Sequence, residues 1–153
     1  MSRVDLQARR SIALAWGVVL TLCCGPAMAQ ADRPTDVAGR WQTDRDDGVV
    51  TIDRCGRELC GRVVGGGRLS ANPDQRDTHN ADPVLRERRV EGLVVLDHIR
   101  SERGVWRAGP VYDPLSGRSA PAATLTPRAD GTLEVKACLA AILCTVQRWH
   151  RQR

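Results

Sequence analysis

The chain contains no phenylalanine and few aromatic residues of any kind. Beyond residue 29, the aromatic side chains are Trp41, Trp106, Trp149 and Tyr112. A hydrophobic core must therefore be built from Val, Leu, Ile and Ala, which bury less area per residue than aromatic side chains do. A small domain of this composition is marginal in stability and benefits from covalent cross-links.

Lysine is almost absent as well, because Lys136 is the single lysine among 23 basic residues. The arginines are spread along the chain and do not form a dense basic run interleaved with aromatic residues. The net charge is +5, and residues 1–29 contribute three arginines and one aspartate to it, so the rest of the chain carries +3. Such a mild excess is typical of an ordinary surface, and we expect no nucleic-acid partner.

Motifs for catalysis and for cofactor binding are missing. The chain has no G-x-S-x-G motif and no C-x-x-C motif, and no Gly-Lys-Ser/Thr follows the triple glycine at 65–67. The three histidines, His79, His98 and His150, are isolated from one another in sequence. We therefore expect a protein that is not an enzyme and that needs no cofactor.

One loop is rich in oxygen ligands that could bind calcium. Its candidate ligands are Asp74, Asp77, Asn80 and Asp82. They lack the ligand spacing of an EF-hand, and Asp and Asn are common in loops because they bond to turn backbone. We expect no metal site here.

The first 29 residues resemble an export signal. Three arginines, at positions 3, 9 and 10, precede an apolar run from Ile12 to Leu22, and Ala27-Met28-Ala29 has the small-x-small form of a cleavage site. The run is shorter than the roughly 20 residues of a membrane span. We expect residues 1–29 to be removed, leaving residues 30–153 as one domain that is periplasmic or secreted and not stably inserted in the membrane.

Four cysteines remain after this cleavage, which is the even number expected for disulfides in an oxidising compartment. Cys55 and Cys60 flank a four-residue loop between two β-like runs, and Cys138 and Cys144 bracket a short apolar loop. Three pairings are possible. We favour the two local bridges, because opposed residues of a hairpin have Cα separations that suit a disulfide.

Most of the chain beyond residue 38 alternates polar and apolar residues with a period of two, in short runs separated by turn sequences. We count eight candidate strands: Gly39–Thr43, Gly48–Cys55, Cys60–Val64, Leu93–Ile99, Val105–Tyr112, Ala122–Thr126, Thr132–Cys138 and Leu143–Arg151. This pattern predicts an all-β fold, a small antiparallel eight-stranded barrel, since closure removes exposed edges. A two-sheet sandwich is the alternative that the period does not exclude.

The stretch from Gly65 to Arg89 interrupts this alternation. It is polar, and Asp82-Pro83 followed by apolar and charged residues indicates the start of a short helix. A long connection on a tightly turned β domain is a common place for binding loops.

The two ends of the predicted barrel carry a further pattern. Gly39-x-Trp41 lies on the first strand, and Arg151 shares a strand face with Trp149 on the last, whereas Arg148 lies on the opposite face. This arrangement resembles the lipocalin-type barrels, in which an arginine covers the tryptophan at the closed end. The resemblance implies that Arg151 stacks on Trp41, a contact worth about 1 kcal/mol.

A broader resemblance covers nearly the whole chain beyond the signal. It rests on Cys55-Gly56 with Leu59 to Val64, Asp77 to Leu93, Trp106 with Gly109, Val111 to Pro114 with Gly117, and the final Cys138, Gln147, Trp149 and Arg151. These segments are similar to the bacterial family named domain of unknown function 2147, which implies an exported lipocalin-like barrel without an assigned activity. In place of an aromatic residue that the family usually has shortly after Gly117, this chain has Arg118-Ser119-Ala120-Pro121.

Five residues are candidates for ligand contacts. Tyr112 and Asp113 end a predicted strand that also carries Trp106, and they would line an open barrel end beside Arg86 and Arg88. The alternative is that Asp113 starts a type I turn and Tyr112 packs, because Asp-Pro-x-x-Gly is a turn sequence.

The sequence favours a noncatalytic exported protein that binds a small, partly apolar ligand inside the barrel. The alternative is an envelope module with a solidly packed barrel whose long connection contacts another protein.

Overall fold

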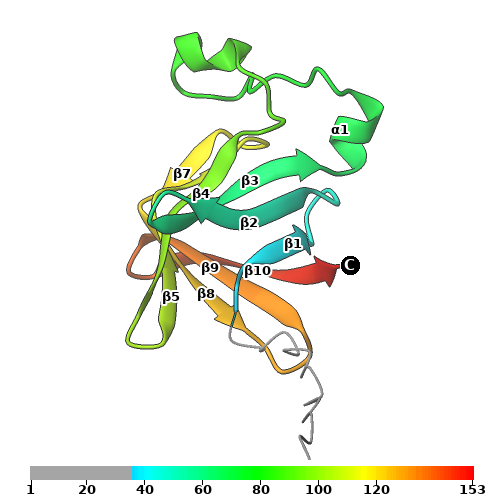
Figure 1. Cartoon of the computed structure of the whole chain (residues 1–153). Coiled ribbons are helices and arrows are strands. Elements are labelled where there is room, and N and C mark those ends of the chain that lie inside the picture. The colour runs from blue at the N-terminus through cyan, green and yellow to red at the C-terminus, as the bar shows by residue number, and fades with distance from the viewer. Residues whose placement is uncertain (1–35) are drawn as a thin grey trace, which may run out of the picture. The chain divides into compact units, whose positions relative to one another are not determined.

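The structure is a computed structural model that describes residues 36–153. The predicted export signal lies outside the described residues. The described elements, shown in Figure 1, are β1 (Gly39–Gln42), β2 (Val49–Cys55), β3 (Glu58–Gly65), α1 (Gly67–Ala71), the 3-10 helix η1 (Pro83–Glu87), β4 (Val94–Glu102), β5 (Val105–Ala108), β6 (Val111–Asp113), β7 (Arg118–Ala120), β8 (Ala122–Pro127), β9 (Thr132–Ala140) and β10 (Leu143–Gln152). Within residues 36–153, no helix has the length and apolar character needed to cross a membrane.

The strands form a closed antiparallel barrel, as predicted, and not a sandwich. Their order in the sheet is β3-β2-β1-β10-β9-β8-β5-β4, and β3 also pairs with β4, which closes a ring of eight. The short strand β6 follows β5 along the same neighbour, because β4 pairs with both β5 and β6. The short strand β7 pairs with β6 in turn. Gly109-Pro110 therefore divides the strand predicted over residues 105–112, and β7, which precedes β8 across Pro121, was not predicted.

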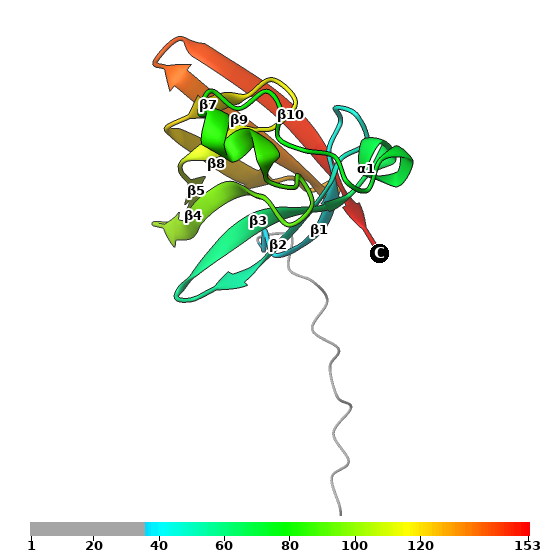
Figure 2. The same cartoon turned by 90° about the horizontal axis from the view of Figure 1, so that it is seen from above.

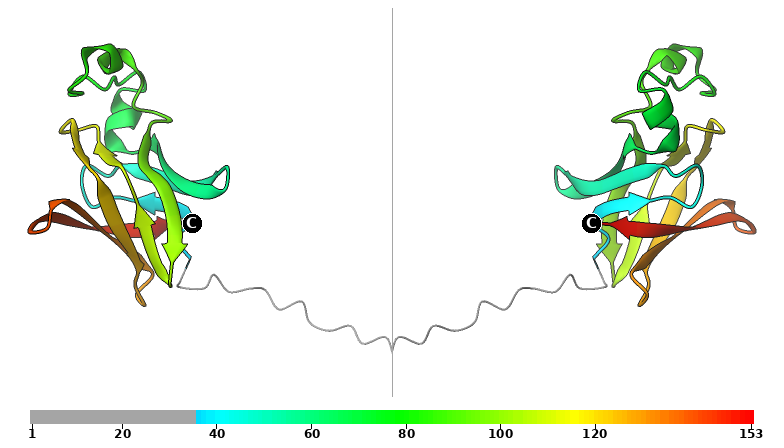
Figure 3. Two further views of the ribbon diagram at one scale, coloured as in Figure 1. Left: turned by 90° about the vertical axis from the view of Figure 1, so that its left-hand side faces the viewer. Right: turned by 90° about the vertical axis from the view of Figure 1, so that its right-hand side faces the viewer.

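The up-and-down chain path gives the barrel two different ends (Figures 1, 2 and 3). The far end carries short turns, at residues 56–57, 103–104 and 128–131. The other end, which we call the mouth, carries the longer segments: the β1–β2 loop (43–48), the β3–β4 connection (66–93), the β6–β7 turn (114–117) and the β9–β10 turn (141–142). The chain's irregular backbone is thus concentrated at the mouth.

Strand alternation builds the core. On β2, Val50 and Ile52 are buried while Asp53 is exposed, as the period of two predicts. Leu133 and Val135 on β9 follow the same rule and are also buried. The fully buried residues are Val37, Trp41, Ile52, Leu96, Ile99, Leu125, Leu133 and Asp77.

Strand β4 departs from this rule at a bulge. Leu96 and Ile99 are both 1% exposed although they are three residues apart. His98 between them has a φ of 48°, in the left-handed region, and the register with β3 shifts at this point. The extra residue turns the side chains of Asp97 and His98 outward together, a common effect of a bulge.

Both local disulfides are present, which confirms the pairing predicted from spacing. Cys55–Cys60 joins β2 and β3 with Cα atoms 5.8 Å apart, and Cys138–Cys144 joins β9 and β10 with Cα atoms 4.0 Å apart. The first bridge holds the β2–β3 hairpin at the far end, and the second holds the β9–β10 hairpin at the mouth. Each end of the barrel is therefore cross-linked by one disulfide.

The far end is sealed by Trp41 and Arg151, which are directly opposed on β1 and β10. The Arg151 guanidinium lies 4.4 Å from the centre of the Trp41 ring. It also donates hydrogen bonds to the carbonyl oxygens of Ala38 and Asp36, both at 3.0 Å. A Cβ atom on Gly39 would lie 2.5 Å from this guanidinium, so glycine leaves room for the arginine.

We expect Arg151→Ala to lower the free energy of unfolding by about 2 kcal/mol, because it removes the cation–π contact and two charge-assisted hydrogen bonds. Arg148→Ala is the matched control on the opposite face of β10, where an exposed substitution costs less than about 0.5 kcal/mol. Urea unfolding monitored by tryptophan fluorescence measures both. Equal losses in the two variants would contradict a sealing role for Arg151.

Candidate ligand-binding site

The half of the barrel nearest the mouth is not filled by side chains. A cavity of about 320 Å³ opens there, bounded by strands and by three of the four mouth segments, the β1–β2 loop, the β3–β4 connection and the β6–β7 turn. Its apolar wall is formed by Val50, Val63, Leu69, Val90, Val95, Leu96, Val111, Ala120, Val135, Ala137, Leu139 and Trp149. The volume is at the lower end of the range for small-molecule sites, and its predominantly apolar lining is typical of them.

The inward face of β10 changes in character along its length. Trp149, buried in the core, forms the inner part of the cavity wall, and Gln147 and Thr145 follow it toward the mouth. The Trp149 indole N–H donates to the Gln147 side-chain oxygen at 2.8 Å. The indole N–H is thus satisfied within the protein, and the cavity wall changes from apolar inside to polar at the rim.

The β3–β4 connection covers part of the mouth (Figure 1). It starts with α1, a single short turn that was not predicted because it lacks a side-chain cap. Leu69 of α1 and Val90 at the end of the connection are buried and contribute to the cavity wall. The predicted short helix is present as η1, where Asp82 caps the chain by accepting from the Val84 N–H at 2.9 Å.

A buried carboxylate holds this connection to the barrel. Asp77 is fully buried, and its two oxygens accept from the Tyr112 hydroxyl at 2.5 Å, the Asn80 amide at 2.8 Å and the Arg88 guanidinium at 2.8 and 2.9 Å. Arg88 also lies over the Tyr112 ring, 5.3 Å from its centre. Burial of a charged carboxylate away from water is unfavourable unless hydrogen bonds and opposite charge compensate it, and Tyr112, Asn80 and Arg88 supply both.

The network changes the ionisation of the tyrosine. Burial raises the pKa of Tyr112, and the hydrogen bond that its hydroxyl donates to the Asp77 carboxylate raises it further. The hydroxyl therefore stays protonated through the physiological range and serves as a fixed donor. Its ring meanwhile lines the cavity.

Only some of the five candidate ligand residues lie at the cavity. Tyr112 and Asp113 line it. Arg88 is engaged with Asp77, and Arg86 donates to the Asn80 carbonyl oxygen at 2.8 Å, so both arginines secure the connection. Trp106 is not among the lining residues, because β5 starts at the far end and Trp106 packs against the core there.

Asp113 holds the turn that follows it. Its side chain accepts from the Leu115 N–H at 3.0 Å and from the Ser116 hydroxyl at 2.7 Å. Gly117 ends the turn at a φ of +69°, and a Cβ there would collide with the His79 carbonyl oxygen. The turn thus packs directly on the connection, which requires glycine at this position.

The candidate calcium ligands have separate partners within the described chain. Asp77 and Asn80 belong to the Tyr112 network, Asp82 caps η1, and Asp74 forms an ion pair with Arg89 at 3.5 Å. These contacts are consistent with the turn and capping roles that Asp and Asn take in loops.

The rim of the mouth carries charged residues that sequence patterns did not indicate. Arg45, from the β1–β2 loop, and Arg118, at the start of β7, line the cavity opening, and both are exposed. Arg68 of α1 also lines it but is paired with Asp46 at 3.1 Å. These residues are far apart in sequence and meet only because three mouth segments surround one opening.

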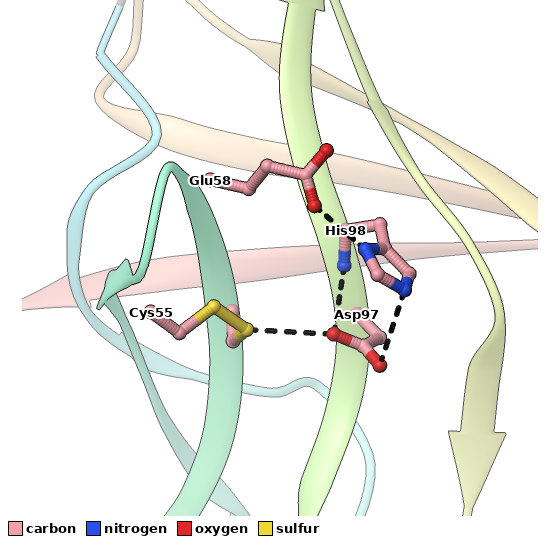
Figure 4. Close-up of a disulfide and its surroundings, with 5 residues drawn as sticks. Cys55, Glu58, Asp97 and His98 are labelled. Atoms are coloured by element: carbon pink, nitrogen blue, oxygen red, sulfur yellow. Dashed lines mark hydrogen bonds and ion pairs between the residues drawn. A yellow bond between two sulfur atoms is a disulfide. The ribbon is translucent and has the colours of Figure 1, made fainter.

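A second cluster of polar groups lies at the β4 bulge (Figure 4). His98 Nδ1 is 2.6 Å from Glu58 Oε2, and Asp97 Oδ1 is 3.4 Å from Cys60 Sγ. The hydrogen bond to Glu58 raises the pKa of His98, and the same bond lowers the pKa of Glu58. Cys55, Cys60 and Asp97 come within 4.8 Å of one another, but the disulfide consumes the two thiols that a metal would require as ligands.

The fold is that of a lipocalin-like barrel. The chain resembles a solved structure described as protein HP1028 from the human pathogen Helicobacter pylori, which belongs to the lipocalin family. The TM-score is 0.65 at 17% sequence identity, and the match covers 77% of this chain and 84% of that chain. No curated protein matches the sequence.

The family itself is identified by sequence. The profile of the family described as an uncharacterized protein conserved in bacteria, DUF2147, matches residues 39–151. The chain belongs to this family, which confirms the resemblance drawn from its motifs.

Tyr112 is the single tyrosine of the chain, so its ionisation can be followed by the near-ultraviolet absorbance of tyrosinate. We expect the folded protein to titrate above the ordinary pKa of 10.0, and Asp77→Asn to move the midpoint down because the carboxylate charge is removed. Since the pKa of Tyr112 is raised in the folded protein, the stabilisation from its protonated hydroxyl is complete below the pKa of unfolded Tyr112. This stabilisation is lost as pH rises through the pKa of folded Tyr112. Identical midpoints in folded and unfolded protein would contradict the network.

For the bulge cluster, we expect His98 to titrate above 6.5 in a proton NMR titration of the histidine ring signals. On the basic side, the stabilisation from the His98–Glu58 pair is complete below the unfolded pKa of His98 and is lost as pH rises through the raised pKa of folded His98. On the acidic side, the same stabilisation is lost as pH falls through the lowered pKa of folded Glu58. Glu58→Gln should lower the His98 midpoint, whereas the exposed control Glu91→Gln should leave it unchanged. A His98 midpoint that does not respond to Glu58→Gln would argue against the pair.

Proposed function

We propose that this protein is an exported, noncatalytic binding protein that holds a small, partly apolar ligand in the barrel cavity. The observation that carries the proposal is the unfilled cavity of about 320 Å³ in a barrel whose far end is closed by the buried Trp41 and by Arg151. Protein interiors are normally packed with few voids larger than a water molecule. A cavity of this size, open at one end and sealed at the other by Trp41, is the form of a ligand site.

The cavity lining suggests how the ligand lies. Its apolar part contacts the inner wall around Leu96, Val135 and Trp149, and its polar part lies at the rim near Gln75, where side chains can hydrogen-bond to it. Ala120 also lines the cavity, and it belongs to the stretch after Gly117, residues 118–121, in which the family resemblance implies an aromatic residue that this chain lacks. The small side chain enlarges the cavity on this side, so the ligand differs in shape from one that contacts an aromatic ring there.

The chemistry of the lining supports binding without catalysis. Among the described residues that line the cavity, none is a histidine or a cysteine. Asp46 is paired with Arg68, Asp113 holds its turn, and Tyr112 donates to Asp77. The Ser116 hydroxyl and the Asp113 carboxylate both lie at the cavity, but their hydrogen bond belongs to the β6–β7 turn, and the described lining offers no histidine as a base beside this hydroxyl.

Export is supported by the disulfides and by the pattern of residues 1–29. Both cysteine pairs expected to remain after cleavage are bridged, and disulfides persist in oxidising compartments such as the periplasm. We infer that cleavage after residue 29 releases residues 30–153 as a single domain into the periplasm or beyond. Under this proposal neither a cofactor nor nucleic acid takes part.

The alternative, an envelope interaction module, requires a solidly packed barrel, and the open cavity favours the ligand-binding function. Native mass spectrometry of protein purified from its own bacterial envelope distinguishes the two. A uniform bound small molecule supports ligand binding, whereas ligand-free protein that co-purifies with a stoichiometric protein partner supports the interaction module.

Filling the cavity should abolish binding. Ala137 on β9 lines the cavity, so Ala137→Trp places an indole in the ligand space. We expect at least about a tenfold loss of affinity for an apolar fluorescent sulfonate such as anilinonaphthalene sulfonate, because the probe loses its apolar contacts.

The matched control is Ala122→Trp, since Ala122 lies on the neighbouring strand β8 and is exposed. This variant should bind the probe as the unmodified protein does. Thermal melting verifies that both variants are folded. Unchanged binding in folded Ala137→Trp protein would show that the cavity is not the binding site.

A further inference from the structure

The tip of the β9–β10 hairpin is apolar and exposed. This hairpin tip consists of residues 139–143, Leu-Ala-Ala-Ile-Leu, and all five residues are exposed. Ile142 is 97% exposed, Leu143 61% and Leu139 46%, and Val146 further down β10 is 55% exposed. Hairpin turns normally carry Gly, Asn or Asp, which satisfy the backbone and face water. Turn chemistry therefore does not account for this tip.

The tip is held in its exposed position. The Cys138–Cys144 disulfide closes the hairpin immediately below it, with Cα atoms 4.0 Å apart. Figures 2 and 3 show the hairpin reaching beyond the neighbouring strands. Five apolar side chains on a short cross-linked projection cannot fold back into the core, so their burial requires something outside the barrel.

The hairpin itself carries charge of one sign. From residue 135 to residue 147 the hairpin has no carboxylate, and its only charged side chain is Lys136. Arg45 and Arg118 are exposed on the rim of the same mouth, to which Leu139 of the tip contributes. Neither arginine has an ion-pair partner among residues 36–153. The hairpin therefore presents apolar groups with a cation and no anion, and the exposed aspartates of the mouth, Asp44, Asp46 and Asp47, lie on the separate β1–β2 loop.

We propose that the hairpin tip inserts into the headgroup region of an anionic phospholipid surface, which brings the barrel mouth against the bilayer. An apolar tip can enter the boundary between headgroups and acyl chains, while a lysine stem extends its ammonium to the anionic phosphates. Anionic lipid adds an attraction for each cation near the surface.

The shape of the tip favours a lipid surface over a second copy of this chain. A stable protein–protein interface buries about 800 Å² on each partner and is closely complementary in shape. A narrow convex tip of five residues is too small for such an interface, whereas a fluid headgroup region adapts to it. This proposal does not depend on ligand binding, because vesicle binding and probe binding are measured separately.

Flotation with phospholipid vesicles tests the proposal on the purified protein. Vesicles of phosphatidylcholine containing roughly 30% phosphatidylglycerol should carry the protein upward, and pure phosphatidylcholine vesicles should carry much less of it. Ile142→Asp should lower binding to the anionic vesicles at least about tenfold, since it removes the most exposed apolar side chain and adds a repelled charge.

The control is Val105→Asp, which changes an exposed valine at the far end of the barrel. It should bind the vesicles as the unmodified protein does, and thermal melting verifies that both variants are folded. A further variant, Ile142→Trp, should show a blue shift of its added fluorescence with the anionic vesicles, because the indole leaves water. Addition of the vesicles to Val105→Trp should produce no such shift.

Three results would overturn the proposal. The first is the absence of binding to anionic vesicles. The second is binding that Ile142→Asp leaves unchanged or that Val105→Asp reduces equally, since the contact would then lie elsewhere. The third is a dimer in analytical ultracentrifugation that Ile142→Asp dissociates while vesicles do not bind, which would assign the tip to a second copy of the chain.

Discussion

Closure of the eight-stranded ring is the constraint on which the rest of this structure depends. Once β3 pairs with β4, the number of strands sets the width of the interior, and only the size of the inward side chains decides how much of it is filled. The two large inward side chains, Trp41 and Trp149, belong to the far end and the middle. Toward the mouth the inward residues are small, such as Ala120 and Ala137, so an open volume remains there. The scarcity of aromatic residues thus determines the position of the cavity.

The buried Asp77 carboxylate gives the long connection one defined position. Loops usually lie on the surface, where water satisfies their backbone and side chains. Here a loop residue is fully buried and receives hydrogen bonds from the barrel through Tyr112 and from the connection through Asn80 and Arg88. Without these donors a charge at this depth would be costly, so the network specifies how the connection sits on β6. Part of the cavity wall, from Leu69 and Val90, is placed by the same arrangement.

Short sequence patterns predicted those features of the fold that depend on residues close together in the chain or directly opposed on paired strands. The period of two located the strands, and the spacing of Cys55 from Cys60 identified opposed hairpin residues. The family resemblance assigned the Trp41–Arg151 stack for a related reason, because the two residues are directly opposed on neighbouring strands. The bulge at His98 could not be predicted in this way, since the left-handed conformation fell on a histidine with no glycine or asparagine to mark it.

The candidate site was predicted less completely because it is assembled from distant segments. Tyr112 and Asp113 were found because they end a strand at the mouth. Trp106 was placed there as well, but its strand runs from the far end, and several residues separate it from the opening. Arg45 and Arg118 had no sequence signal at all, since their relevance comes only from three loops that meet around one opening. Asp77 likewise drew attention as a metal ligand, and its hydrogen bond to Tyr112 became visible only in the folded chain.

The sheet order also determines how the barrel is assembled. Most neighbouring strands in the ring follow one another in the chain, and apart from β3 and β4, which the long connection joins, their pairing closes short loops with a small entropic cost. The exception with the longest loop is β1 with β10, the first strand with the last. This seam completes the ring, and the Trp41–Arg151 stack lies directly across it. The cation–π contact therefore holds the first and last strands of the barrel together. Weakening this contact favours separation of β1 from β10, while the hairpins on either side stay paired.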